Sequence, residues 1–331
     1  MAAKAVDIAA PRFSIGMGPR VWGFRWGETE YVISALPLGG YVRMAGMADD
    51  ETTVVEGGEE EEVDPARTFD AKPLWARALV ISAGVIMNFL FAVVVFVGLG
   101  AAYGKAVAAP VLGEILPDRP AAAAGLRSGD HIREAGGHPV GSWDEFVEIV
   151  EASPDRPLAL VVERGGVRLP TAVTPESAPG AGEGERVGKI GAGVGMQVEH
   201  IPLSPTESVA YGFQRTWDFG AMIVVLVGKL IIGEESLRNL GGPLTIGQVS
   251  GEAARLGVET FLSFMAIISV NLAILNLLPI PILDGGHLLF LGIEGVRGKA
   301  LSVESRVRMS QVGMVMVVAL MLWAITNDVL R

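Results

Sequence analysis

Apolar residues are concentrated in long uncharged blocks. Residues 78–104 carry no charge, and a helix of that length, rising 1.5 Å per residue, crosses the roughly 30 Å apolar core of a bilayer. Two further apolar blocks fall near the end of the chain. The pattern therefore predicts a multi-pass α-helical membrane protein with three transmembrane helices, at residues 77–104, 257–283 and 309–326.

The first 76 residues alternate in the manner of strands. Residues 13–18 and 29–44 are rich in β-formers, and the second stretch contains the turn-forming cluster Pro37-Leu38-Gly39-Gly40. These features predict a β-hairpin. The neighbouring Trp22 and Trp26 are typical of a membrane interface, and packing in a small core is the alternative. Residues 49–64 are strongly acidic, which predicts a disordered loop, with an acidic interaction segment as the alternative.

Residues 108–198 have the composition of a soluble α+β domain. Strands are predicted near 111–116, 158–163, 167–174 and 189–196, and an amphipathic helix at 143–152. Residues 202–256 are ambiguous. The apolar run at 219–228 is too short to cross a bilayer, so we expect an interfacial or re-entrant helix there, followed by a Gly/Pro-rich linker at 239–251.

Composition narrows the possible functions. Half of the 331 residues are hydrophobic and none is cysteine, which excludes a disulfide framework, a thiolate zinc site and a cysteine nucleophile. The sequence has no stripe of basic residues that would indicate nucleic-acid binding. The loop at 284–308 is basic and is therefore expected in the cytoplasm, which places the domain at 108–198 outside. The basic residues of the loop at 284–308 are Arg297, Lys299, Arg306 and Arg308.

One carboxylate lies at the end of the second apolar block. Asp284 follows Pro279 and Pro281, which must break a helix because proline lacks an amide donor. An ionisable group at such a break is a functional-site hypothesis. The alternative is that Asp284 caps a short helix over 285–292. Composition alone does not distinguish the functional role of Asp284 from the capping role.

Several motifs resemble a known family in the same order along the chain. Together they resemble site-2 proteases, the intramembrane zinc metalloproteases, and most closely the bacterial regulator-of-sigma-E branch with a single PDZ domain. Ala124-Gly125-Leu126 with Gly129-Asp130, and Trp143-x-x-Phe146, resemble a bacterial PDZ domain. The family motifs are Phe13-Ser-Ile-Gly-Met-Gly-Pro19, Pro37-Leu-Gly-Gly-Tyr-Val42, Gly84-x-x-x-Asn88, Gly241-Gly242-Pro243 and Asn276-x-x-Pro279-x-Pro281-x-Leu283-Asp284-Gly285.

The resemblance implies roles for individual residues. Asp284 matches the family's third zinc ligand. Asn88, Asn271 and Asn276 resemble asparagines that hold an unwound substrate backbone. Gly39, Gly40 and Tyr41 resemble an edge strand that presents the substrate. The implied activity is regulated intramembrane proteolysis of a single-span substrate, such as an anti-sigma factor, in the inner membrane. The PDZ domain would bind a peptide or C-terminus outside the cell membrane.

The chain also departs from the family. The family's zinc is held by two histidines of an H-E-x-x-H helix and by the aspartate, and its glutamate activates the metal-bound water. No H-E-x-x-H occurs in these 331 residues, and His131, His138, His200 and His287 lack its spacing. We therefore expect a chain that begins just after this helix, retains one of three zinc ligands and is inactive. The alternative is a non-catalytic membrane adaptor.

Overall fold

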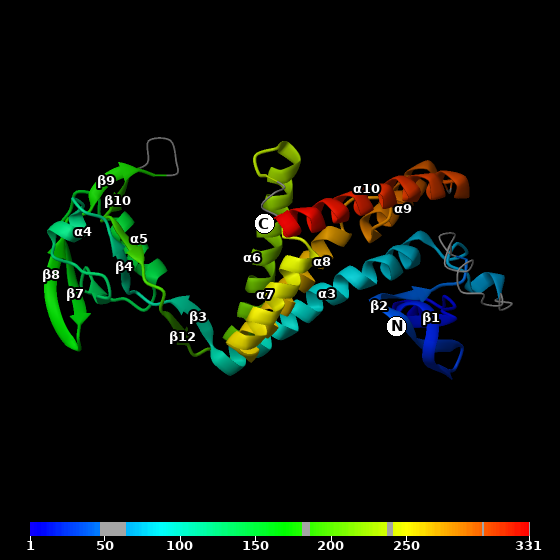
Figure 1. Ribbon diagram of the computed structural model, residues 1–331, viewed down its shortest axis with the longest axis horizontal. Coiled ribbons are helices and arrows are strands. Elements are labelled where there is room, and N and C mark those ends of the chain that lie inside the picture. The colour runs from blue at the N-terminus through cyan, green and yellow to red at the C-terminus, as the bar shows by residue number, and fades with distance from the viewer. Residues whose placement is uncertain (47–63, 181–185, 237–240, 300, 331) are drawn as a thin grey trace. The chain divides into compact units, whose positions relative to one another are not determined.

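The computed structural model describes residues 1–46, 64–180, 186–236, 241–299 and 301–330. Apart from Asp64, the acidic loop predicted at 49–64 lies outside these residues. The chain forms two compact units, one made of Met1–Phe96 with Gly212–Arg331 and the other of Val97–Tyr211. Figure 1 shows helices dominating the first unit and strands dominating the second.

Three helices in the described part of the chain are long and apolar enough to cross a membrane. They cover Leu74–Tyr103, Val258–Asn276 and Glu304–Leu330, within α3 (Leu74–Tyr103), α8 (Val258–Asn276) and α10 (Val303–Leu330). Large apolar side chains such as Phe91, Leu272 and Val315 point outward on them. Outward apolar side chains along whole helices are typical of contact with lipid.

Two more helices occupy the ambiguous region. The helix α6 (Pro205–Ile232) is continuous and much longer than the three turns predicted near 219–228. Gly220 on α6 lies near Val270 of α8 and Phe89 of α3, so these helices pack together. The prediction of a linker at 239–251 is wrong from residue 243 onward, because α7 (Pro243–Leu256) is a helix that begins at a proline suited to its first turn.

The N-terminal strands β1 (Arg12–Trp26) and β2 (Thr29–Arg43) form a strongly bent sheet. Phe24 lies opposite Tyr31, whereas Phe13 lies opposite both Tyr31 and Val42. Residues 12–15 therefore lie between 30–33 and 40–43. The reversal between the two strands occurs at residues 27–28, where Gly27 has positive φ, and β2 runs through the predicted turn at 37–40.

A short N-terminal segment precedes this sheet and packs against two helices. It contains α1 (Ala2–Ala5) and continues to Ala10. Ala3, Ile8 and Ala10 are buried with Phe69, which follows the short 3-10 helix η1 (Pro65–Arg67), and with Ile81 of α3. Leu288 and Leu291 of α9 (Asp284–Arg297) cover the same cluster. The chain start, α3 and α9 thus share one small core.

The second unit contains a domain at residues 105–201, called here the sheet domain. Its antiparallel four-stranded sheet has the order β6-β5-β7-β8, with smaller strand pairs around it. Ile132, Phe146, Leu160 and Val162 are at most 2% exposed and form its core. Phe146 and Val150 are one turn apart on α5, so the helix buries one face. The helices here are α4 (Pro120–Ala123) and α5 (Trp143–Glu151), and the strands are β3 (Lys105–Ala108), β4 (Leu112–Ile115), β5 (His131–Ala135), β6 (His138–Pro139), β7 (Leu158–Arg164), β8 (Val167–Val173), β9 (Glu176–Pro179), β10 (Arg186–Lys189), β11 (Ala192–Val194) and β12 (Val198–Ile201).

Candidate functional site

The break after α8 is a compact irregular segment at residues 277–283. The helix ends at Asn276, three residues before the first proline of the break, because the residue before a proline disfavours helical backbone. The amide of Ile280 then donates to the carbonyl of Leu278 at 2.7 Å, and that of Leu283 to the carbonyl of Ile280 at 2.9 Å. These short-range bonds satisfy part of the backbone that the prolines release.

Two glycines bring the next helix directly against this break. A Cβ added to Gly285 would collide with the carbonyls of Leu277 and Leu278. A Cβ added to Gly286 would lie 2.6 Å from the Cα of Pro281 and closer still to the Ile280 carbonyl. Only glycine allows α9 to begin so close to the end of α8. The pair therefore fixes where Asp284 is held.

Asp284 is the first residue of α9, and Leu283 is the N-cap without a side-chain capping bond. The alternative prediction, in which Asp284 caps a following helix, is therefore wrong. A carboxylate in the first turn still interacts favourably with the helix dipole. Burial raises the pKa of the Asp284 carboxyl above its ordinary value, and the imidazole of His287 opposes this to a smaller extent. His287 packs edge-on against Phe290, with 6.0 Å between ring centroids.

The Asp284 carboxylate faces a glycine of α3. A Cβ added to Gly84 would lie 3.5 Å from Asp284 Oδ2. Asn88, one turn further along the same face of α3, accepts a hydrogen bond from Ser269 Oγ at its carbonyl, at 3.0 Å. The side-chain Oδ1 of Asn88 lies 3.4 Å from the same hydroxyl. The motif Gly84-x-x-x-Asn88 thus lies where α3 meets both α8 and α9.

The other predicted site residues are spread around this point. Asn271 and Asn276 are partly buried on α8, and among the described residues no hydrogen bond joins either of them to Asp284. Gly40 lies opposite Ile15 and Tyr41 opposite Ser14, with Gly39 preceding them in β2. In the described part of the sheet, residues 40–43 pair with a neighbour on one side only. They form an edge that could accept another strand.

The residues present do not complete a zinc site. Among the described residues, no three His, Cys, Asp or Glu side chains come close enough to hold a metal ion. Catalytic zinc needs three protein ligands with a fourth position left open for water. Asp284 can supply one carboxylate oxygen, so this set does not fit the metal, and no chemical step through zinc can be derived from it.

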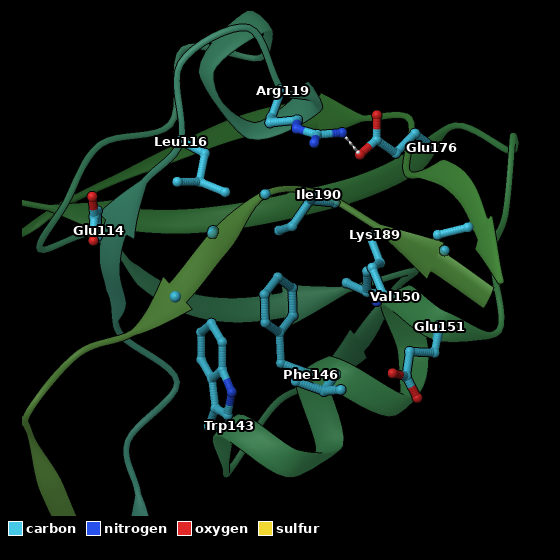
Figure 2. A pocket seen from close by; sticks show the side chains of 16 residues that line it. Glu114, Leu116, Arg119, Trp143, Phe146, Val150, Glu151, Glu176, Lys189 and Ile190 are labelled. Carbon is cyan, nitrogen blue, oxygen red and sulfur yellow. Dashed lines mark hydrogen bonds and ion pairs between the residues drawn. The ribbon is translucent and has the colours of Figure 1, made fainter. Parts of the chain in front are cut away.

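A second candidate site lies in the sheet domain. A groove of about 600 Å³ runs between α5 and the segment 188–193. Figure 2 shows Trp143, Phe146 and Val150 of α5 directed toward Ile190 across the groove. Arg119 pairs with Glu176 at the rim. Gly191 and Gly193 also line the groove, and a Cβ added to Gly191 would collide with the side chain of Arg119 at the rim.

Sequence reasoning missed two parts of these sites. It did not identify the groove, because its apolar lining has the same pattern as a helix that packs on a core. It also missed the buried ion pair between Arg77 of α3 and Glu294 of α9. A lone acid within the apolar stretch around Glu294 was the available signal.

Comparisons with known proteins agree with the motif order. The sequence profile of peptidase family M50 matches residues 1–320. The zinc metalloprotease RasP of Bacillus licheniformis is 33% identical over 398 residues, which cover 99% of this chain and 93% of that protein. The regulator of sigma-E protease RseP of Escherichia coli is 31% identical over 438 residues, with the same coverage of 99% and 93%. The regulator of sigma-W protease RasP of Bacillus subtilis is 31% identical over 403 residues. With a match along nearly its whole length, the chain belongs to peptidase family M50, the family of the site-2 proteases.

Proposed function

We propose that this chain forms the substrate-handling core of a site-2-type intramembrane zinc metalloprotease, with Asp284 as one of three zinc ligands. The observation that carries the proposal is the position of Asp284, held by two glycines at a broken apolar helix in a member of this family. The two histidines of the metal site and the general base would come from an H-E-x-x-H helix, which these 331 residues do not contain. This chain is therefore expected to be inactive by itself.

The substrate in this proposal is a single-span membrane protein, such as an anti-sigma factor, cut within the inner membrane. Relatives are named regulators of sigma-E and sigma-W, which supports this class of substrate. The edge at residues 40–43 would pair with an unwound substrate segment, because a free strand edge offers backbone donors and acceptors. Asn88, Asn271 and Asn276 would hold other polar groups of that backbone.

The sheet domain would act as a PDZ domain on the extracytoplasmic side. This orientation follows if the basic stretch 284–308 lies in the cytoplasm; the stretch was predicted as a loop, but it contains α9 and the start of α10. Its groove would take an extended peptide or a C-terminus. The support for this role is the groove itself, in which the apolar wall of α5 lies opposite the segment 188–193. Binding there would select substrates before the membrane step.

The experiment compares the 331-residue chain with the same chain extended at its N-terminus by a family H-E-x-x-H helix. Zinc is measured by mass spectrometry in purified protein, and cleavage is measured on a single-span reporter in membranes. The extended chain should hold about one zinc per molecule and cut the reporter, and Asp284→Ala should lose both properties. Glu252→Gln, at an exposed acid on α7, is the matched control and should change neither.

Two results would refute the proposal. Asp284→Ala in the extended chain could keep its zinc, which would remove Asp284 from the metal site. Alternatively, the extended chain could bind no zinc and cut nothing. That result would favour the second candidate function, a non-catalytic membrane adaptor that binds peptides in its groove. The lack of a three-ligand cluster among the described residues is the observation that keeps this candidate open.

A further inference from the structure

A largely buried ion pair joins the start of α3 to the last turn of α9, away from Asp284. Both Nη atoms of Arg77 donate to the carboxylate of Glu294, one of them to Oε2 at 3.2 Å. The side chain of Arg77 is 7% exposed and that of Glu294 is 17% exposed. The two residues are 217 positions apart in the sequence, so the pair is a tertiary contact between the two helices.

Further contacts define how α9 lies along α3. A Cβ added to Gly295 would lie 3.5 Å from the Cδ1 of Leu74, beside the ion pair. At the other end, Asp284 faces Gly84 at the 3.5 Å given above. The start of α3 therefore meets the end of α9, and Gly84 meets the start of α9, so the helices run antiparallel. Arg77 and Gly84 are seven residues apart and share one face of α3.

The contacts around Arg77 hold its guanidinium in one position but add little to the stability of the fold. Its guanidinium lies over the ring of Phe69, 6.0 Å from the centroid, and 3.6 Å from a carboxylate oxygen of Asp70. Among the described residues its Nε is buried without a hydrogen-bond partner. A buried ion pair with an unsatisfied donor contributes little net stability, and its best-attested role is to set the register of packed elements.

We propose that Arg77 and Glu294 are positioning residues, whose ion pair fixes the register of α9 on α3 and so holds the Asp284 carboxylate at Gly84. The other contacts described between these helices are the apolar packing of Ile81 with Leu288 and Leu291 and the approach of each helix to a glycine of the other. Apolar surfaces tolerate sliding because they are not directional, whereas a two-pronged pair of arginine and carboxylate accepts one alignment. The role of Asp284 in metal binding rests on the proposed function, but the register does not.

The chain contains no cysteine, so introduced cysteines are its only thiols and can be cross-linked selectively. A Gly84→Cys/Asp284→Cys double variant is treated in membranes with a short bifunctional thiol reagent, and the rate of intramolecular cross-linking is measured. Arg77→Gln should slow this reaction on the order of tenfold, since it leaves the Glu294 carboxylate without its cation. Glu294→Gln should slow it less, because Arg77 keeps the carboxylate of Asp70 as a partner. The charge-swapped variant Arg77→Glu/Glu294→Arg is made together with Asp70→Asn, because a glutamate at position 77 would otherwise face the Asp70 carboxylate. This variant should restore most of the rate.

A second cysteine pair separates local register from global folding. Asn88→Cys/Ser269→Cys joins α3 to α8, where the native side chains already touch, and its rate should not change with Arg77→Gln. The exposed pair formed by Glu304 and Arg308 on α10 is the matched ion-pair control, and its double Gln variant should leave both rates unchanged.

Three outcomes would overturn the inference. Arg77→Gln could leave the cross-linking of residues 84 and 284 unchanged, it could slow both cysteine pairs equally, or the charge swap could fail to restore the rate. Each measurement is independent of zinc and of proteolysis. Failure of the inference and failure of the proposed function are thus distinguishable.

Discussion

Replacing Gly286 by alanine should displace the start of α9 and loosen the candidate site. The added Cβ would lie 2.6 Å from the Pro281 Cα, whereas ordinary contacts begin at 3.4 Å. The backbone must therefore move by at least 0.8 Å, and an atom of the Ile280 carbonyl lies closer still. No flexible side chain is involved that could rotate away, so the cost falls on the packing of α8 against α9.

The magnitude follows from two opposing terms. Overpacking of this kind costs about 1 to 3 kcal/mol, and two backbone collisions place Gly286→Ala near the upper end of that range. Alanine gains up to about 1 kcal/mol over glycine in a helix. The net loss is about 2 kcal/mol, which corresponds to roughly thirtyfold faster local opening. Gly292→Ala on the same helix meets nothing within 4 Å and should retain only the gain.

The assay is amide hydrogen exchange of the detergent-solubilised chain, followed by mass spectrometry. Peptides from residues 277–290 should exchange faster in Gly286→Ala and at an equal or slower rate in Gly292→Ala, whereas peptides from the sheet domain should not change in either. The reasoning is refuted if Gly286→Ala exchanges as slowly as Gly292→Ala, because the close approach of α9 to the break would then not exist in the protein.

Three further predictions concern other contacts. Burial raises the pKa of Asp130, but hydrogen bonds from Arg164 and the Arg127 amide outweigh it and leave the pKa below its ordinary value. The stabilisation from these bonds should be full above about pH 4 and lost as the pH falls through the lower pKa of the folded state. Hydrogen exchange in β7, corrected for intrinsic rates, should therefore accelerate below that range in the native chain and much less in Asp130→Asn. Asp328 accepts hydrogen bonds from the first amides of α7, so Asp328→Ala should cost about 1 kcal/mol and speed exchange at residues 243–256 while leaving α5 unchanged. Val147→Glu places a charge in the apolar groove and should weaken the binding of an apolar peptide at least about tenfold in fluorescence titrations. If Val147→Glu binds the peptide as well as the native chain does, the peptide binds elsewhere.

Much of the architecture is local and was accessible from the sequence. The three long apolar helices follow from uncharged runs that are long enough to cross a bilayer. The helix at Trp143–Glu151 follows from its apolar spacing and from Ser142, whose Oγ accepts a hydrogen bond from the Glu145 amide. The break after Asn276 follows from two prolines. Each of these signals lies within a few residues of the structure it specifies.

Other local signals were outweighed by packing. The cluster at residues 37–40 favours a turn, yet β2 continues through it because residues 40–43 gain pairing with residues 12–15. Gly241-Gly242-Pro243 looks like a linker. In the structure, a Cβ at Gly242 would lie 2.8 Å from the Ala324 carbonyl, so the motif allows α7 to begin against α10. A glycine required for close approach and a glycine in a loop look the same in one sequence.

The sequence by itself determined which segments are apolar helices, where one of them breaks, and that a single carboxylate follows the break. Tertiary structure alone decided what surrounds that carboxylate. Gly84 lies 200 residues away from it in the chain, and the ion pair between Arg77 and Glu294 spans a similar separation. Such contacts depend on how helices pack, and packing is set by shape and burial across the whole unit. Periodicity and spacing carry no record of it.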